Sequence, residues 1–435
     1  MQLFETLRNG WKLTDLRKKV FFTIMMIILF RIGSYIPAPF IDAKGLSEVM
    51  QATGDGATTL FSYLSLLTGG ALEYGAIFAM GVTPYINSSI IMQLLAVAIP
   101  ALERLQKEGE EGRKKIAQLT RYATVILALI QGTAFYFYLR NSGDFLTYGR
   151  NEAWYVELLP ALTIIMCFTA GSALVMWMGE QIDDKGIGNG ISMILFAGIL
   201  SRAPTAFASL WNMILNKKYF QVGAIAVAFA VVIAFVVFMT AAERRIPVQY
   251  AKRVVGRKMY GGQSSHLPIQ VNMAGVLPII FASSILSIPS TILAFMGSKT
   301  NWFTKILNLF SYDQAFYVVL YLVLIVFFAY FYITIQYNPV EMANNLRKNS
   351  GVVPGIRPGR PTAEFIGKII TRIVLIGAIF LGIMAVLPVL VGTVFKIPGI
   401  SLGGTSVLIL VGVALDTVKA IESQMMMRFY KGFLD

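Results

Sequence analysis

The segment YGAIFAMGVTPYINSSIIMQLLAVAIPAL, residues Tyr74–Leu102, decides the fold class. It contains no Asp, Glu, Lys or Arg, and it is longer than the roughly 20 apolar residues that cross a bilayer as a helix. Nine further segments are free of charge or carry a single arginine: Val20–Ile41, Tyr122–Leu139, Leu158–Gly179, Gly186–Asn216, Tyr219–Ala242, Leu267–Ser298, Gln314–Val340, Ile373–Phe395 and Ile397–Leu415. The sequence therefore predicts an all-α polytopic membrane protein with ten transmembrane helices.

The composition excludes several classes of chemistry. Of the 435 residues, 56% are hydrophobic and 14% are charged, whereas soluble domains have about 45–50% and 25%. The single histidine, His266, and the single cysteine, Cys167, exclude an internal disulfide and a zinc site built from Cys and His clusters. A G-x-x-x-x-G-K-[ST] loop for ATP is also absent from the sequence. These counts predict a protein that is not an enzyme and that needs no cofactor.

The distribution of positive charge predicts the orientation. The net charge is +14, and 26 of the 37 Lys and Arg residues lie in the two tails and in alternate loops, against nine in the opposite loops. By the positive-inside rule both termini are expected to be cytoplasmic. Two basic loops of this face, residues 241–270 and 338–368, are long for connections. A docking surface for a large anionic partner explains both their charge and their length.

Two patterns suggest a departure from a simple bundle. Ala57–Gly70 is apolar but too short to span, so it is either a re-entrant half-helix or an amphipathic helix on the membrane surface. Gly81-Val82-Thr83-Pro84 recurs as Gly275-Val276-Leu277-Pro278, and a Ser-Ser-Ile triplet follows each copy. Because the two copies fall five spans apart, this internal repeat indicates two five-helix halves of inverted topology, residues 1–215 and 216–435.

Three groups of residues within or beside the spans are candidate sites. Gly186–Gly190 is similar to a phosphate-binding glycine loop, but a span and acidic residues precede it, which favours a turn that opens the fifth span. Arg31 lies close enough to the outer end of its span to snorkel. Uncharged polar side chains of the second and seventh spans either bind helices together or line a seam that can hydrate: Asn87, Ser88, Ser89, Gln93, Asn272, Ser283 and Ser284.

The chain resembles the SecY family, the central subunits of protein-conducting channels in bacteria and the related translocon α-subunits of eukaryotes. The resemblance covers essentially the whole chain and rests on motifs in order: Gly81–Ile86 with Ser89-Ile90, Glu108–Lys115, Gly179–Gln181 with Gly186–Ser192, Ala242–Arg245 with Gln249–Ala251, Asn272–Val276, Ile280–Ser284, Arg357–Gly359 and Gly403–Ser406. It favours a channel over a secondary transporter of small solutes, and the scarcity of His, Cys and intramembrane acids counts against an intramembrane enzyme.

The resemblance implies specific roles for residues of this sequence. The pore ring of aliphatic side chains would be Val82, Ile86, Ile187, Ile191, Ile280 and Ile409. The plug, a re-entrant helix over about residues 57–73, would include Phe61, Leu64 and Leu67. A lateral gate between spans 2/3 and spans 7/8 would include Asn87, Ile90, Gln93, Ser283 and Ser284. Docking of the SecA ATPase or the ribosome would involve Arg244, Arg245, Arg253, Arg357 and Arg360.

The same resemblance implies partners and a location. The small membrane subunits SecE and SecG would bind the chain, and preproteins with their signal sequences would pass through it. Ribosomal RNA would be the only nucleic acid it meets. The expected location is the bacterial cytoplasmic (inner) membrane, with the phospholipid bilayer around the helices.

Overall fold

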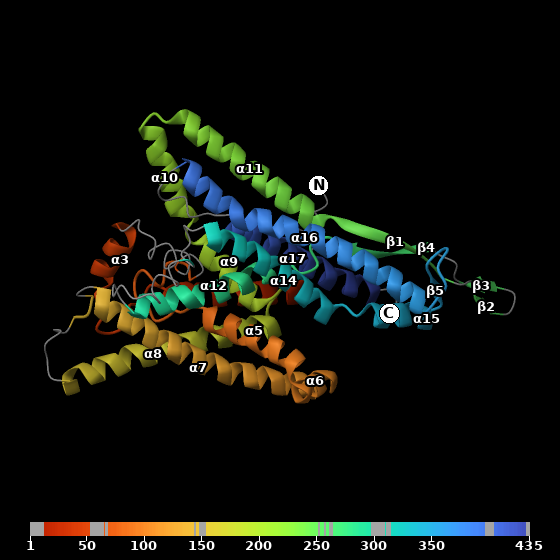
Figure 1. Cartoon of the computed structure of the whole chain (residues 1–435), viewed down its shortest axis with the longest axis horizontal. Helices are drawn as coiled ribbons and strands as arrows, with labels where there is room; N and C mark the ends of the chain where they lie inside the picture. The colour runs from red at the N-terminus through yellow and green to blue at the C-terminus, as the bar shows by residue number, and fades with distance from the viewer. Residues whose placement is uncertain are drawn as a thin grey trace.

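The computed structural model describes residues 13–52, 65, 68–142, 145–147, 154–250, 253–255, 258–260, 264–296, 309, 315–395 and 404–431. An elongated bundle of helices carries a narrow β arm at one end (Figure 1). The helices of the first part are α2 Thr14–Gly33, α3 Ala43–Ala52, α5 Thr83–Ala98, α6 Pro100–Lys107, α7 Glu110–Ser142, α8 Trp154–Lys185, α9 Gly190–Leu200 and α10 Ala203–Leu215. Those of the second part are α11 Tyr219–Ala241, α12 Leu277–Met296, α14 Ala315–Gln336, α15 Pro339–Lys348, α16 Arg360–Phe395 and α17 Gly404–Lys431.

A helix lies in each of the ten predicted segments, but fewer of them meet a strict criterion for spanning. Among the described residues, six helices are long and apolar enough to cross a membrane, or seven if the bent pair α5 and α6 counts as one span. A mostly helical membrane architecture is thus confirmed.

The segment Tyr74–Leu102 is not one continuous helix. Its first residues form successive turns, in which Gly75 and Gly81 have φ of +54° and +53°. Because L side chains rarely adopt such angles, these glycines prevent a helix from starting before Thr83. At the other end Ile99 is extended ahead of Pro100, and α6 leaves α5 at 106°. A residue that precedes proline avoids the helical region, so the proline breaks the helix there.

The all-α prediction is wrong for the long loop 241–270. It contains the strands β1 Glu243–Tyr250, β2 Arg253–Val255, β3 Lys258–Tyr260 and β4 Ser264–Gln270. Strand β1 pairs with β4 along its length and with β5, Gly351–Val352, at its end. The predicted span Leu267–Ser298 therefore begins as a strand, and its helix starts only at Leu277. Hydropathy alone did not separate a β-strand from the start of a helix in this apolar run.

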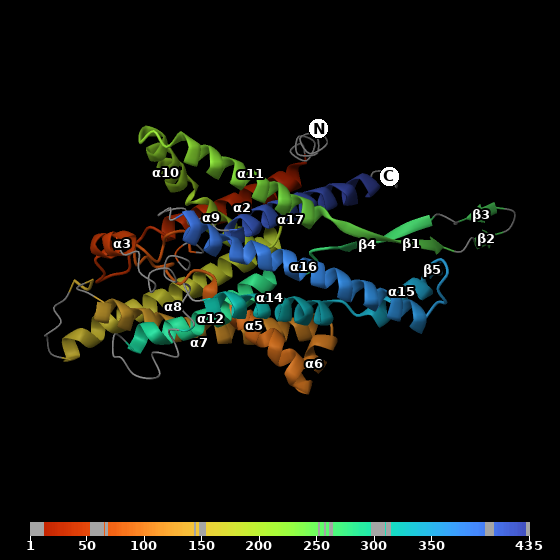
Figure 2. The ribbon, with the colours of Figure 1, turned by 45° about the horizontal axis from the view of Figure 1, so that its top comes forward.

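The base of the β arm packs against the helices. Along β1, Ile246 and Val248 face inward while their neighbours are exposed, the alternation of a half-buried strand. Ile246 joins a buried cluster with Ile366 and Ile370 of α16. Figure 2 shows the β arm projecting beyond the end of the bundle near α15. The second long loop, 338–368, is likewise ordered: it consists of α15, β5 and the first turns of α16.

Helices α8 and α9 approach each other backbone to backbone at two glycines. A Cβ at Gly190 would lie 2.0 Å from the Gly179 carbonyl oxygen, whereas a Cβ at Gly179 would lie 2.5 Å from Cδ1 of Ile191. We expect Gly190→Ala to destabilise the protein by about 1–3 kcal/mol, because a backbone atom must move. Gly179→Ala is the matched control, since only the end of a flexible side chain must shift. The apparent melting temperature of each purified protein in detergent checks this, and equal values for the two variants would contradict it.

Candidate functional site

Aliphatic side chains from four separate helical regions belong to the same large hydrophobic core. Val82 and Ile86 at the start of α5 and Ile409 of α17 are buried in one hydrophobic cluster. Ile191 of α9 and Ile280 of α12 are half-buried and pack against that cluster. Five of the six predicted ring residues are thus brought to one apolar core.

Ile187, the sixth predicted ring residue, lies in a different cluster. It is buried with Leu16 and Met425, and its backbone N–H donates to Thr23 Oγ1 of α2 at 3.2 Å. Three residues N-terminal to α9, it precedes the helix rather than lying on it, so its side chain is not held on the face that carries Ile191. Motif position alone did not reveal this separation.

The glycine segment 186–190 is a turn that opens α9, as predicted. Gly188 has φ of +76°, and Asn189 Oδ1 accepts a hydrogen bond from the Ser192 N–H at 3.0 Å, which caps the helix. The Gly190 N–H donates to Asp183 Oδ1 at 2.7 Å. Since these donors already have partners within the protein and one partner is an aspartate, the turn has little with which to bind phosphate.

Helix α12 packs against α5 and α7, so the second and third predicted spans meet the seventh. The polar side chains of this seam divide into two kinds. Ser88 is buried and donates to the Thr120 carbonyl of α7 at 2.8 Å, which binds two neighbouring helices together. Asn87 Oδ1 of α5 is buried but accepts no hydrogen bond. Asn272 Oδ1 is also buried without a partner, but it lies in the turn before α12, beside Gly377 of α16. An unsatisfied acceptor on α5 favours parting from its neighbours, because water would satisfy it.

The remaining predicted gate residues lie on α5 or α12. Ile90 is buried in the central cluster. Gln93 donates from Nε2 to Ser89 Oγ at 3.2 Å, and Ser283 donates to the Ile280 carbonyl at 2.9 Å. Ser284, its neighbour on α12, is half-buried. All five predicted gate residues therefore lie on α5 or α12, the two helices that meet at the seam.

The predicted plug residues Phe61, Leu64 and Leu67 lie outside the described residues. Directly after them, residues 68–82 form turns rather than a helix, which corrects the predicted re-entrant helix over its last residues. Arg31, predicted to snorkel, instead donates from Nη1 to the Gly69 carbonyl at 2.9 Å. Arg202 also contacts this segment.

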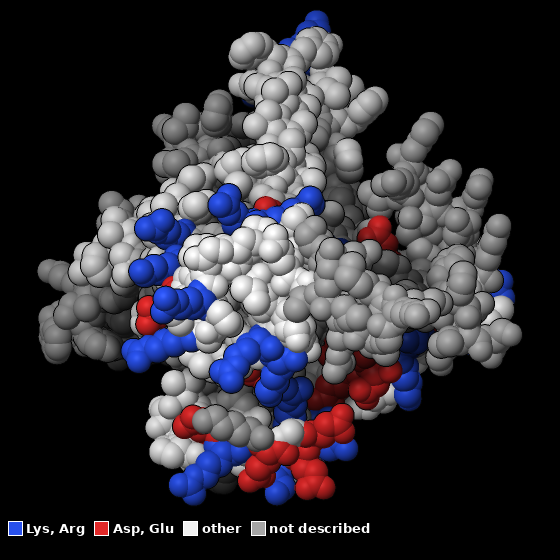
Figure 3. All heavy atoms as spheres, turned by 90° about the vertical axis from the view of Figure 1, so that its right-hand side faces the viewer, with Lys and Arg blue, Asp and Glu red and all other residues white. Residues whose placement is uncertain are grey.

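Basic side chains gather on the end of the molecule that carries α15 and the base of the β arm (Figure 3). Arg244, Arg245, Arg357 and Arg360 are all exposed there. Two of them have acidic neighbours: Arg245 pairs with Glu243 at 2.7 Å, and Arg360 with Glu364 at 3.2 Å. Arg253 lies on β2 in the β arm. His266, the single histidine, lies exposed on β4 of the same arm.

Comparisons with known proteins agree with this architecture. The SecY family model matches residues 76–418. The protein translocase subunit SecY of Streptomyces galbus is 44% identical over 432 residues, covering 98% of each chain. That of Mycobacterium tuberculosis strain H37Rv is 42% identical over 437 residues, again covering 98% of each chain.

Solved structures share the fold at low sequence identity. A structure described as that of a protein conducting channel has a TM-score of 0.68 at 17% identity, covering 94% of this chain and 93% of the other. Sec61 in a canine ribosome-channel complex has a TM-score of 0.63, also at 17% identity, with coverage of 94% and 93%. Together with the family match over most of its length, these relatives show that the chain belongs to the SecY family of protein translocase channel subunits, which are not enzymes.

Proposed function

We propose that this chain forms a pore through which unfolded preproteins cross the cytoplasmic membrane, and from which hydrophobic segments leave sideways into lipid. The observation that carries the proposal is the apolar core that Val82, Ile86, Ile191, Ile280 and Ile409 share. A translocating chain presents every side chain in turn, so a pore for it needs no specific binding site. An aliphatic constriction binds no ion tightly and dewets when empty, which blocks leakage.

Two halves around this constriction are supported by the helix contacts. Among the described helices, α2, α5, α7, α8 and α9 contact one another, and so do α12, α14, α16 and α17. The two groups meet where α12 packs against α5 and α7, and where α17 packs against α9. We take the halves to be residues 1–215 and 216–435, of inverted topology, with ten spans in all and a plug over about residues 57–73.

Lateral release would occur where α5 and α7 face α12 and α14. An apolar segment lodged in this seam would gain about 0.3–0.6 kcal/mol per central Leu-type residue on entering lipid. Over a whole span this amounts to several kcal/mol, which is enough to bias a gate held by few polar bonds. The unsatisfied oxygen of Asn87 on α5 lowers the cost of opening.

Locking this seam is expected to stop transport. Cysteines placed at Gln93 of α5 and Ser284 of α12, with Cys167 changed to serine, would be joined by a short thiol-reactive crosslinker. Because the halves could no longer part there, we expect translocation of a preprotein into vesicles to fall at least tenfold on crosslinking and to recover on cleavage of a reducible linker. Each single-cysteine variant treated alike is the control. Full translocation by a completely crosslinked protein would contradict the gate.

The energy for transport must come from partners, since the chain carries no nucleotide-binding motif. We propose that SecA or the ribosome docks on the arginines of the basic end and the β arm, Arg244, Arg245, Arg253, Arg357 and Arg360, and that SecE and SecG bind the helices within the inner membrane. The basic end and both termini would then be cytoplasmic.

Reconstitution tests the proposed function directly. The chain is purified with SecE and SecG, placed in proteoliposomes and given a purified preprotein with SecA and ATP. Protease-protected preprotein that depends on both the chain and SecA is expected. Vesicles that contain the complete complex yet protect no preprotein would overturn the proposal.

A further inference from the structure

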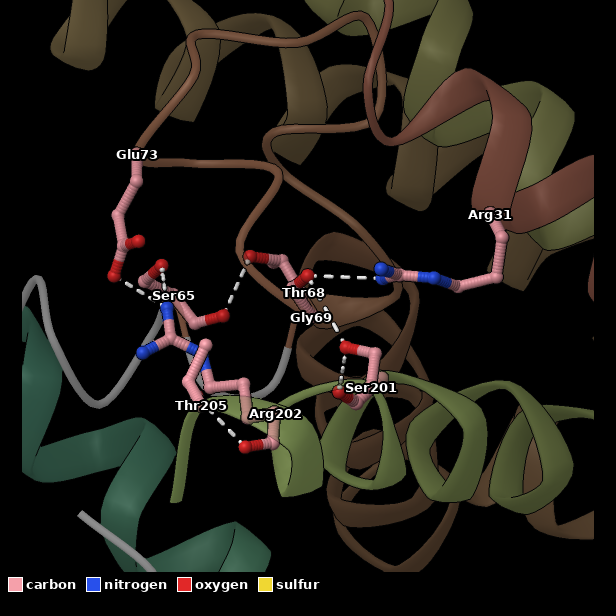
Figure 4. A network of polar contacts seen from close by, with 9 residues as sticks. Arg31, Ser65, Thr68, Gly69, Glu73, Ser201, Arg202 and Thr205 are labelled. Carbon is pink, nitrogen blue, oxygen red and sulfur yellow. Dashed lines mark hydrogen bonds and ion pairs between the residues drawn. The ribbon is translucent and has the colours of Figure 1, made fainter. Parts of the chain in front are cut away.

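Two arginines from separate parts of the chain contact the last part of the predicted plug, at Ser65, Gly69 and Glu73 (Figure 4). Arg202, at the break between α9 and α10, donates from Nη2 to Ser65 Oγ at 2.6 Å and forms an ion pair with Glu73. Arg31, in the last turn of α2, donates to the Gly69 carbonyl. Ser201 Oγ lies 3.3 Å from the same carbonyl oxygen, and its shorter hydrogen bond goes to the Gly198 carbonyl at 2.6 Å. These bonds connect one short segment to two separate helical elements.

The contacts lie in a largely buried place, where an ion pair has more effect than at a surface. The side chains of Arg202 and Glu73 are 18% and 17% exposed, and Ser65 is fully buried. Arg31 is also held in place, because its guanidinium carbon lies 5.0 Å from the centre of the Tyr35 ring and its Nη2 donates to Tyr35 OH at 3.1 Å. Removal of one partner of a buried pair leaves the other charge uncompensated.

The backbone of the segment is shaped for this position. Gly69 and Gly70 have φ of +67° and +90°. A Cβ at Gly69 would lie 2.9 Å from the Gly198 Cα of α9 and 2.7 Å from Arg31 Nη1. Since a side chain would push the segment away from both, glycine is needed for the close approach.

One buried polar atom in these contacts has no hydrogen-bond partner, which lowers the stability of the arrangement. Arg202 Nε is buried without a hydrogen-bond partner. An unsatisfied buried donor opposes burial of the group that carries it, so the arrangement is held by a few strong bonds but is not at its greatest possible stability. Such a balance suits a segment that must stay in place at rest and leave when a chain arrives.

We propose that Arg202 and Arg31 form a polar latch on Ser65, Gly69 and Glu73 that holds the plug in the closed channel, and that opening requires the Arg202–Glu73 pair to part. The proposal rests on the proposed channel function and adds two positioning residues to it. Parting the pair would free the segment from α10, whereas the turns up to Val82 would stay packed through Phe78, whose ring stacks on Phe30 of α2 at 5.9 Å.

The test measures resting ion efflux from proteoliposomes that contain the complete complex without SecA or preprotein. Glu73→Gln keeps the shape of the side chain and removes its charge, and we expect efflux to rise about tenfold, as with Arg202→Gln. The exchanged pair, Glu73→Arg with Arg202→Glu, is expected to return efflux toward the wild-type rate. The matched control is Glu157→Gln, which breaks the 2.6 Å pair between Arg140 and Glu157 without touching the segment.

Wild-type efflux from Glu73→Gln would overturn the latch, and so would an exchanged pair that leaks as much as either single variant. If the exchanged pair does not assemble, Glu73→Gln decides the question alone. The same vesicles are also given SecA, ATP and preprotein. If the wild type translocates preprotein and the efflux of Glu73→Gln equals that of the wild type, the latch alone is rejected. If the wild type does not translocate preprotein, the channel function on which the latch rests is rejected.

Discussion

Replacing Ile86, Ile191 and Ile280 together with asparagine is expected to raise the resting ion leak of the channel at least tenfold. The three side chains come from α5, α9 and α12 and belong to the central apolar core. Polar amides there would bind water, so the constriction would no longer dewet. The measurement is chloride efflux from proteoliposomes, with export of a preprotein that has a weakened signal sequence as the second readout, which we expect to increase.

Ile187→Asn is the discriminating control for this experiment. The structure buries Ile187 with Leu16 and Met425 rather than with the other five predicted ring residues. A ring of five therefore predicts an efflux near the wild-type rate for Ile187→Asn, whereas a ring of six predicts a leak. If the triple variant neither leaks nor accepts weakened signal sequences, the assignment of the ring is wrong.

Arg357→Glu is expected to reduce SecA-driven translocation at least tenfold while insertion of membrane proteins by the ribosome continues. Arg357 is exposed at a turn framed by Gly355 and Gly359, whose φ values are +82° and +104°. Its carbonyl accepts a hydrogen bond from Thr362 Oγ1 at 2.8 Å, which holds the turn on α16. Among the described residues it forms no ion pair, unlike Arg360, so its charge is available to an acidic partner. Reversal would place like charges together at the interface.

The control for Arg357→Glu is Lys218→Glu, an equal charge reversal at an exposed lysine just before α11. Lys218 is predicted to lie on the opposite side of the membrane, where SecA does not bind. Translocation of a preprotein into vesicles at rising SecA concentration distinguishes the two variants. ATP-driven translocation by Arg357→Glu at the wild-type rate would remove Arg357 from the docking surface.

The sequence alone predicted most of the membrane architecture. Runs without charged residues located a helix in each of the ten segments, since the hydropathy of a segment depends only on its own residues. The turn at residues 186–190 was also predictable, because its glycines and the preceding acidic residues are local features. The types of residue at the proposed constriction were visible as well, through motifs that occur in order along the chain.

Only the tertiary structure decided which of these residues meet. It showed that Ile187 belongs to a different hydrophobic cluster from the other five aliphatic residues. It further showed that the loop 241–270 is a β arm whose inward face packs on α16. It also showed that Arg202 binds Glu73, a partner 129 positions away. Hydropathy and motif order are properties along the chain, whereas burial, strand pairing and ion pairing depend on which distant segments the fold brings together. For that reason the apolar character of the channel is visible in the sequence, and the polar contacts proposed to keep it closed are not.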